Sequence, residues 1–489
     1  MISEKVPDQA EAIPQATTTH GYKPLEETAK WKITPQSFTD DEKNDFGTKR
    51  EDRIGYLEGL RGLLAFEVLL WTFFRILSPA MVTDTDLDGT RPASFVQTSP
   101  EWQSVLRKVL SPLFWDGTLQ ATFFFVLSGR VVSQTFVERR TATTLAGAAF
   151  RRPIRLLIPV SVALALTSIL VATGSFSAAQ TFSKRVGNAF AQPPPIWEST
   201  IQYFYTLVGY FFDTSDSMIT TGMLFFQPRG IIWFIPRVFM ESYTIYTFSY
   251  LLPFTVTKWK FIFLGVFTLA LWWIGSFGWY SLTGLTLTEL VVVYDLPSLA
   301  RQGICLPLPR FVSRWRSNLT LSTYIPPVTL LGLGTLLKYL WATKFYDQRN
   351  DEIVWHASQT TGGFNTGFEV TETAYPRLDD WFLVAGSFYL LEMGPGLVRR
   401  LFDNPILKHL GRISFSLFLV SGMIIMSLGP LIQNHLFVSQ GWRNESGILG
   451  VCFVSLVPLC LISAEIFHRL IDEPSCLFAR FMFKWMKED

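Results

Sequence analysis

The stretch LEGLRGLLAFEVLLWTFFRIL, residues 57–77, decides the fold class of this chain. It is long enough to cross a bilayer as a helix, which takes about 20 mostly apolar residues. It nevertheless holds Arg61 and Glu67 among its apolar residues. A charged side chain inside a membrane is costly, so each of these is a candidate for a functional site. The stretch therefore predicts a transmembrane helix that carries part of a site.

Three further segments combine an arginine-containing motif with a long apolar run. They are FFVLSGRVVS at residues 124–133, RRPIRLLIP at residues 151–159 and LGRISFSLFLVSG at residues 410–422. The segment RLIDEPSCLFAR at residues 469–480 closes the last of these runs. The arginines lie at the mouth of an apolar run or inside it, which is typical of a polytopic membrane protein.

Composition agrees with a membrane protein. Charged residues make up only 17% of the chain, whereas a soluble domain carries about 25%. Hydrophobic residues make up 49%, aromatic residues 15%, and the mean hydropathy is +0.26. The net charge of +2 gives no basis for a nucleic-acid partner. The four cysteines are widely spaced without metal-ligand spacing, so we expect buried apolar residues and no metal site.

The chain divides into a tail, a membrane domain and a second short tail. Residues 1–53 are polar and charged, which predicts a disordered cytosolic N-terminal tail. Residues 54–475 form an all-α transmembrane domain with about ten helices. Residues 476–489 form a short cytosolic C-terminal tail. The ten apolar runs lie near residues 56–77, 118–137, 154–174, 231–254, 259–280, 283–300, 320–341, 380–396, 405–430 and 447–470.

Loop charges predict the orientation of these spans. With a cytosolic N-terminus, the loops after the even-numbered spans lie inside, and each of them carries Arg or Lys residues. The loops expected outside, near residues 78–117, 175–230, 342–379 and 431–446, are poorer in basic residues. Because positive charge is retained in the cytosol, both termini are expected there, in an endomembrane or the plasma membrane.

The order and wording of the motifs resemble the integral-membrane acyltransferase-3 family, and its fungal members in particular. The resemblance covers most of residues 55–480. It implies an acyl-CoA-dependent O-acyltransferase without a bound cofactor. Such an enzyme moves an acyl group, here expected to be acetyl from acetyl-CoA, to a hydroxyl of a small metabolite, lipid or glycan, as in secondary metabolism. The alternative is an inactive relative that acts as a transporter or a binding protein.

The first family motif is matched at its start and departs from the family at its catalytic position. Arg61 stands where the family has an arginine that suits a phosphate of acyl-CoA. Eleven residues later the family has a histidine, and this chain has Thr72, whose hydroxyl is no base near neutral pH. Glu67 is the nearest carboxylate that can replace the histidine as base. The alternative is that Glu67 pairs with Arg75 or with another helix.

The second and third motifs supply further arginines. Arg130 stands where the family commonly has an aromatic or aliphatic residue, and it is either an anion ligand or an arginine paired within the protein. Arg151, Arg152 and Arg155 match the family's RRxxRLxP segment. The resemblance favours a role for them in binding the CoA phosphates, and anionic lipid headgroups are the alternative.

A second candidate carboxylate lies in the segment IIWFIPRVFMESYTIYTF, residues 231–248, which resembles a family segment with a glutamate. The family glutamate falls on Val238, and Glu241 follows one helical turn later, on nearly the same face. Glu241 is therefore a second candidate base. Arg237 stands four residues before it and can also simply neutralise it.

The remaining histidines give little evidence of chemistry. His356 and His435 fall in loops expected outside, and we expect both to be solvated surface residues. The family's second histidine is also absent, because Ser421 follows LFLV.

Overall fold

The computed structural model describes residues 55–83, 99–195, 197–212, 232–306, 319–345, 351–357, 363–364, 375–394 and 396–488. These residues belong to one unit of contacts, Lys49–Asp489. The expected N-terminal tail, residues 1–53, lies outside the described residues.

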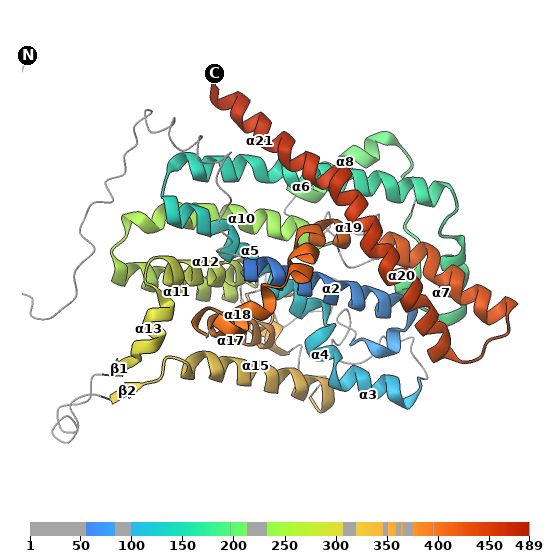
Figure 1. Ribbon diagram of the computed structural model, residues 1–489, viewed down its shortest axis with the longest axis horizontal. Coiled ribbons are helices and arrows are strands. Elements are labelled where there is room, and N and C mark those ends of the chain that lie inside the picture. The colour runs from blue at the N-terminus through green and yellow to red at the C-terminus, as the bar shows by residue number, and fades with distance from the viewer. Residues whose placement is uncertain are drawn as a thin grey trace, which may run out of the picture. The chain divides into compact units, whose positions relative to one another are not determined.

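Each of the ten apolar runs contains a helix, as expected. These helices run side by side through most of the picture in Figure 1. They are α2 (Gly55–Leu77), α5 (Gly117–Arg139), α6 (Ala142–Ala172), α10 (Phe234–Leu251), α11 (Thr257–Trp273), α12 (Gly278–Val292), α15 (Ile325–Thr343), α17 (Leu378–Met393), α19 (Pro405–Asn434) and α20 (Glu445–Phe467).

Shorter elements connect the long helices. One of them is a two-stranded antiparallel pair that joins β1 (Ile304–Leu306) to β2 (Leu319–Leu321). The others are α3 (Glu101–Val109), α4 (Ser111–Phe114), α7 (Ser177–Val186), α8 (Thr200–Phe212), α13 (Leu296–Gln302), α16 (Asp351–Val354), α18 (Gly396–Phe402), α21 (Glu473–Glu488), the 3-10 turns η2 (Pro79–Met81), η3 (Ala189–Ala191) and η4 (Leu252–Phe254), and the π-helical turns η6 (His435–Ser439) and η7 (His468–Asp472).

The structure supports a helical, multi-pass membrane protein. Within the described residues, four helices are long and apolar enough to cross a membrane: Ala142–Ala172, Ile325–Thr343, Pro405–Ser439 and Glu445–Lys487. The number rises to six if α12 with α13, and α17 with α18, each form one bent span. α2 is less apolar because it carries Glu58, Arg61, Glu67 and Arg75. A total of ten spans therefore stays a prediction.

The two ends of the bundle match the division of the loops made from charge. β1 and β2 flank the loop that is expected inside after the sixth apolar run, α13 ends that run, and all three lie at the left of Figure 1. α3 and α7 belong to loops expected outside and lie at the right of the same view. These elements of the two kinds of loop thus lie at opposite ends of the long helices, and the orientation in the membrane stays a prediction.

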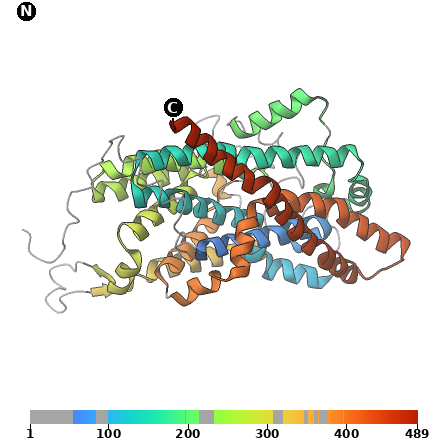
Figure 2. The same cartoon turned by 45° about the horizontal axis from the view of Figure 1, so that its top comes forward.

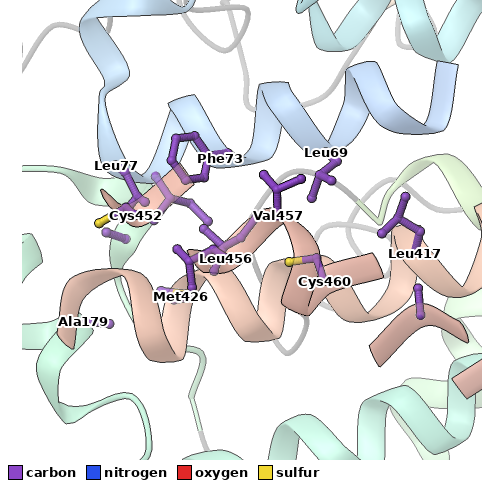
Figure 3. Close-up of a cluster of buried hydrophobic side chains, with 14 of the residues drawn as sticks. Leu69, Phe73, Leu77, Ala179, Leu417, Met426, Cys452, Leu456, Val457 and Cys460 are labelled. Carbon is purple, nitrogen blue, oxygen red and sulfur yellow. The ribbon is translucent and has the colours of Figure 1, made fainter. Parts of the chain in front are cut away.

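The largest buried cluster joins α2 to α19 and α20. Leu69, Phe73, Leu417 and Met426 lie in it, and Figure 3 shows their side chains facing one another between the helices. α7 contributes Ala179 from the side. This contact holds the first long helix against the last two.

The cysteines agree with the prediction of small buried residues where they are described. Cys452 and Cys460 are fully buried in the same cluster. Cys476 is half-buried, and the side chain of Cys305 lies outside the described residues.

Glycines allow α2 and α19 to approach closely. A Cβ atom on Gly59 or Gly62 would overlap the carbonyl oxygen of Phe402 or Leu407, respectively. A Cβ atom on Gly411 would overlap the carbonyl oxygen of Glu58. Small residues let helix backbones touch in a membrane, where the hydrophobic effect between helices is weak. These glycines therefore fix how α2 lies along α19.

The C-terminal segment is helical. The expected tail from residue 476 onward belongs to α21, which continues α20 through the π-helical turn η7, so that Glu445–Lys487 forms one long helix. α21 crosses α6, where Phe483 packs on Gly147 and Phe150 (Figure 2).

The prediction that His356 is a solvated surface residue is wrong. Its side chain is 2% exposed, and Nδ1 lies 2.6 Å from the carbonyl oxygen of Trp272. The backbone N–H of Ala357 donates to the carbonyl oxygen of Trp273 at 2.7 Å. The loop thus folds back over the end of α11 and takes the histidine with it. His435 is exposed, as expected.

Candidate functional site

Arg61 lies near the start of α2 and joins two of the motifs. Its Nε and Nη2 atoms donate to the carbonyl oxygen of Gly411 on α19, at 2.9 and 2.5 Å. Glu58 lies 3.7 Å away on the preceding turn. The Arg61 side chain remains 34% exposed, so part of the guanidinium is accessible.

Residues from two more motifs meet Arg61 at this end of the bundle. Arg155 of α6, Asp472 of η7 and Cys476 of α21 interact with it electrostatically. Arg155 is exposed, whereas Asp472 is 3% exposed. We call Arg61, Arg155, Asp472 and Cys476 the Arg61 cluster. The family resemblance assigned Arg61 and Arg155 to the same ligand, whereas the approach of Asp472 and Cys476 was not expected and depends on η7 packing against α6 and α19.

The other two arginines of the third motif point to different neighbours. Arg152 donates through Nη2 to the hydroxyl of Ser128 on α5 at 3.0 Å, and it interacts electrostatically with Arg155. Its buried Nε has no hydrogen-bond partner among the described residues. Arg151 donates through Nε to the carbonyl oxygen of Gly147 at 2.8 Å. Arg152 thus extends the Arg61 cluster, and Arg151 faces α21 through Phe483.

Arg130 is paired within the protein. Its Nε lies 3.0 Å from Oε1 of Glu392 on α17, and both side chains are almost fully buried. Nη1 donates to Gln134 at 2.9 Å, and the hydroxyl of Tyr56 donates to the other oxygen of Glu392 at 2.7 Å. Of the two interpretations of Arg130, this geometry favours the internal pair. Glu392 was not among the expected site residues, although its place as an acid inside the eighth apolar run was a signal for it.

Glu67 lies at the contact between α2 and α5, and Thr72 lies on the same helix, α2. Glu67 accepts a hydrogen bond from Nε2 of Gln120 at 3.2 Å. Thr72 is fully buried, and its hydroxyl donates to the carbonyl oxygen of Val68 at 2.8 Å. Arg75 lies over the rings of Trp71 and Phe190, so its described contacts do not include Glu67.

Glu241 lies on α10 at a separate place. Ser276 donates to its Oε1 at 3.2 Å, and Arg237 interacts with it electrostatically. Its buried Oε2 has no hydrogen-bond partner among the described residues. Neither Glu67 nor Glu241 makes a described polar contact with the Arg61 cluster.

Sequence reasoning missed a second group of buried charges. Nζ of Lys338 on α15 lies 2.5 Å from Asp116, at ion-pair distance of Asp380, and 3.8 Å from Asp379. Each of these side chains is 1–3% exposed. We call these four residues the Lys338 cluster. The signals in the sequence were a lysine within the seventh apolar run and two aspartates at the start of the eighth.

A histidine–carboxylate pair, in which the histidine is partly buried and the aspartate is buried, was also not expected from the sequence. Nδ1 of His468 lies 2.9 Å from Oδ2 of Asp472 within η7. The pair is adjacent to the Arg61 cluster because Asp472 belongs to both. No group of three or more His, Cys, Asp or Glu residues suited to a metal ion occurs in the described part of the chain.

The geometry divides the chemistry between three places. The Arg61 cluster, with Arg152, offers guanidinium groups that suit the phosphates of an acyl-CoA. The carboxylates Glu67 and Glu241 lie within the bundle, where a hydroxyl could give up a proton. Comparison with protein-family models, with curated proteins and with solved structures finds no match for this chain.

Proposed function

We propose that this chain is a multi-pass membrane O-acyltransferase. It moves an acyl group, acetyl from acetyl-CoA, onto a hydroxyl of a small metabolite, lipid or glycan. The observation that carries the proposal is the meeting of Arg61, Arg152 and Arg155 at one end of the bundle, beside the backbone of Gly411. The resemblance of the same motifs to the acyltransferase-3 family supports it.

The charge balance of this site suits a polyphosphate. Arg155 lies within electrostatic reach of both Arg61 and Arg152, and the described carboxylate neighbours of Arg61 are Glu58 and Asp472. Like charges at close range repel, and a bound phosphate relieves that repulsion while accepting several hydrogen bonds. Anionic lipid headgroups have the same chemistry, so competition between free CoA and anionic lipid distinguishes the two sources.

The carboxylates supply the base that the absent family histidine would provide. Glu67 is the first candidate, since its partner Gln120 is neutral and leaves the carboxylate able to take a proton. Glu241 is the second candidate. Thr72 uses its hydroxyl in a hydrogen bond within its own helix, which suits a packing role.

An inactive relative that transports or binds a substrate is the second candidate function. The replacement of the family histidine by Thr72 favours it. Buried intramembrane charges are typical of transport pathways, so this function would require Lys338 to exchange its carboxylate partners for a substrate.

Turnover of acetyl-CoA by the purified protein separates the two functions. The protein in lipid nanodiscs is given radiolabelled acetyl-CoA and an extract of hydroxylated metabolites and lipids. We expect release of the free thiol together with a labelled ester. Saturable binding of acetyl-CoA with neither product would support the binding or transport function instead.

The membrane orientation belongs to the same proposal. We expect a reporter after Asp489 and a reporter before Met1 to be cytosolic, and one inserted near Gly362 to face the lumen or the exterior. Protease protection of tagged membranes measures this. Termini on opposite sides would mean an odd number of spans, and one of the bent pairs would then be re-entrant.

A further inference from the structure

Three polar side chains lie in the region where α2 faces α5. Glu67 and Trp71 stand one turn apart on the same face of α2. Gln120 of α5 donates from Nε2 to Glu67 at 3.2 Å. The indole of Trp71 packs on Gly117, three residues before Gln120, and a Cβ atom on that glycine would lie 2.7 Å from Cε2 of the ring. Since Cε2 is bonded to Nε1, the indole N–H lies at the same contact.

Two of these groups are buried with hydrogen-bonding capacity unused. Trp71 is 5% exposed, and Gln120 is fully buried. Among the described residues, no group accepts from the indole N–H of Trp71, and none donates to Oε1 of Gln120. A buried donor or acceptor left unsatisfied costs about 1–3 kcal/mol. A single unsatisfied buried atom is common. A donor, an acceptor and a carboxylate at one helix contact together form a set that complements a ligand with hydroxyl groups.

We propose that this set, Glu67, Trp71 and Gln120, is the acceptor subsite, and that it takes a neutral molecule with at least two neighbouring hydroxyl groups. This rests on the proposed acyltransferase function. One hydroxyl accepts from the indole N–H and donates to the Gln120 oxygen. The other faces the carboxylate of Glu67.

The chemistry of the three groups selects the substrate class. A hydroxyl both accepts and donates, so it alone satisfies an N–H and a carbonyl oxygen together. An anionic acceptor would be repelled by Glu67. The surroundings are apolar, with Phe74 and Trp115 in ring contact 5.2 Å apart in the cluster that also holds Trp71. The subsite thus suits the polar head of an amphiphilic polyol rather than a charged metabolite.

The transfer step balances without a further reactant. The hydroxyl oxygen attacks the thioester carbonyl carbon, a C–O bond forms and the C–S bond breaks. The hydroxyl proton passes to Glu67 and then to the departing thiolate. The products are an ester and a free thiol.

Trp71→Phe tests the anchor, because it removes the indole N–H and keeps a ring beneath Arg75. With 1,2-octanediol as acceptor and acetyl-CoA as donor, we expect the KM for the diol to rise about tenfold. The KM for acetyl-CoA should stay as in the wild type. Trp279→Phe is the matched control: Trp279 is 2% exposed, and its indole N–H also has no partner among the described residues. An equal effect of both variants on the diol would overturn the proposal.

A binding measurement on the wild type keeps the proposal testable if the variant fails to fold or if no turnover is found. Indole-¹⁵N-labelled protein is titrated with 1,2-octanediol and, separately, with 1-octanol. We expect the Trp71 signal to shift saturably with the diol and much less with the monohydric alcohol. A Trp71 signal that neither compound moves overturns the subsite. A shift without ester formation retains the subsite and overturns the proposed acyltransferase function.

Discussion

The Arg61 cluster and the Lys338 cluster both place charge inside an apolar bundle, but they differ in access and in the kind of partner. Arg61 is 34% exposed, donates to a backbone carbonyl oxygen, and has the half-exposed Glu58 3.7 Å away as its nearest carboxylate. Lys338 is 3% exposed and lies against three carboxylates. The first cluster keeps positive charge available to a ligand, whereas the second joins three helical segments by charges that face one another.

The difference shows how to separate a binding site from a structural charge in a membrane protein. Hydropathy marks both clusters equally, because each interrupts an apolar run. Only the partners distinguish them: a group neutralised by buried protein charges has little to offer a ligand. Substitutions in the two clusters test this distinction.

Glu67→Gln should have the largest effect. Glu67 lies on α2, six residues after Arg61 of the Arg61 cluster. Its partner Gln120 lies on α5, four residues after Asp116 of the Lys338 cluster, so the Glu67–Gln120 hydrogen bond joins the two helices that carry these residues. The substitution keeps the shape and removes the base, so we expect turnover to fall by roughly 2–4 orders of magnitude. The measurement is acyl transfer per folded molecule.

Two outcomes would contradict the role of Glu67. If the Glu67→Gln variant is as active as the wild type, Glu67 is not the base, and Glu241 and His468 become the candidates. Thr72→His restores the family residue, and transfer gained only in that variant would indicate a chain that has lost its catalysis.

Lys338→Met should chiefly affect folding. Removing one partner of a buried ion pair leaves the others uncompensated, at a cost of about 3–5 kcal/mol. We expect a sharp loss of monodisperse protein and a lower unfolding temperature, measured by size-exclusion chromatography and thermal denaturation. Lys258→Met, at an exposed lysine, is the control. If the Lys338→Met protein is well folded and has lost only its activity, the Lys338 cluster is functional, and the distinction between a binding cluster and a structural cluster is wrong.

Arg61→Ala and Arg152→Ala should weaken acyl-CoA binding by about 10–100-fold, since charge-assisted hydrogen bonds contribute about 1.5–3 kcal/mol. Isothermal titration with CoA measures this, and Lys258→Ala is the control. Full CoA affinity with reduced expression would make these arginines anchors of the helix ends.

The pH dependence of stability should be affected least, through Glu352 in the loop before α17. Burial and the neighbouring Asp379 raise the pKa of Glu352 to about 8, against the opposing effect of Arg377. The folded protein then keeps a proton that the unfolded chain loses above its ordinary pKa of 4.5, so stability falls as pH rises from about 4.5 to about 8.

Glu352→Gln should remove this slope and raise the unfolding temperature at pH 9 relative to the wild type by roughly a few degrees. Thermal denaturation between pH 5 and pH 9 measures the slope. His356 lies 3.9 Å from Glu352, and burial lowers the pKa of its imidazole, so His356→Gln serves as the control. Parallel curves for the wild type and Glu352→Gln would refute the assignment.

The helices could be predicted because length and apolarity alone decide them. Their ends could not. α6 begins at Ala142, well before the apolar run, because Thr141 caps it and its first turns pack under α21. The run at residues 283–300 divides at Asp295, whose backbone adopts a positive φ of 49° between α12 and α13. Such features depend on capping and tertiary contact rather than on hydropathy.

The candidate site could be predicted residue by residue, but its pairing could not. The motifs singled out Arg61, Arg130 and Glu67. The partners Gly411, Glu392 and Gln120 are a backbone carbonyl, a carboxylate 262 residues from Arg130 and a neutral amide. Nothing in local sequence couples such groups. The partner nonetheless decides whether an arginine is available to bind a ligand or forms a structural contact within the protein.

The close packing of α2 on α19 has a consequence for how the protein is made. The Arg61–Gly411 bond joins residues 350 positions apart, and the glycine face of α2 packs against that late helix and against Phe402 just before it. At about 5–20 residues per second, roughly 20–70 s of synthesis separate the two helices. During that interval the first long helix has its guanidinium and its glycine face exposed to lipid or to the insertion machinery. The helix that opens the membrane domain is therefore among the last to reach its final contacts, and a chain truncated before α19 would leave it without them.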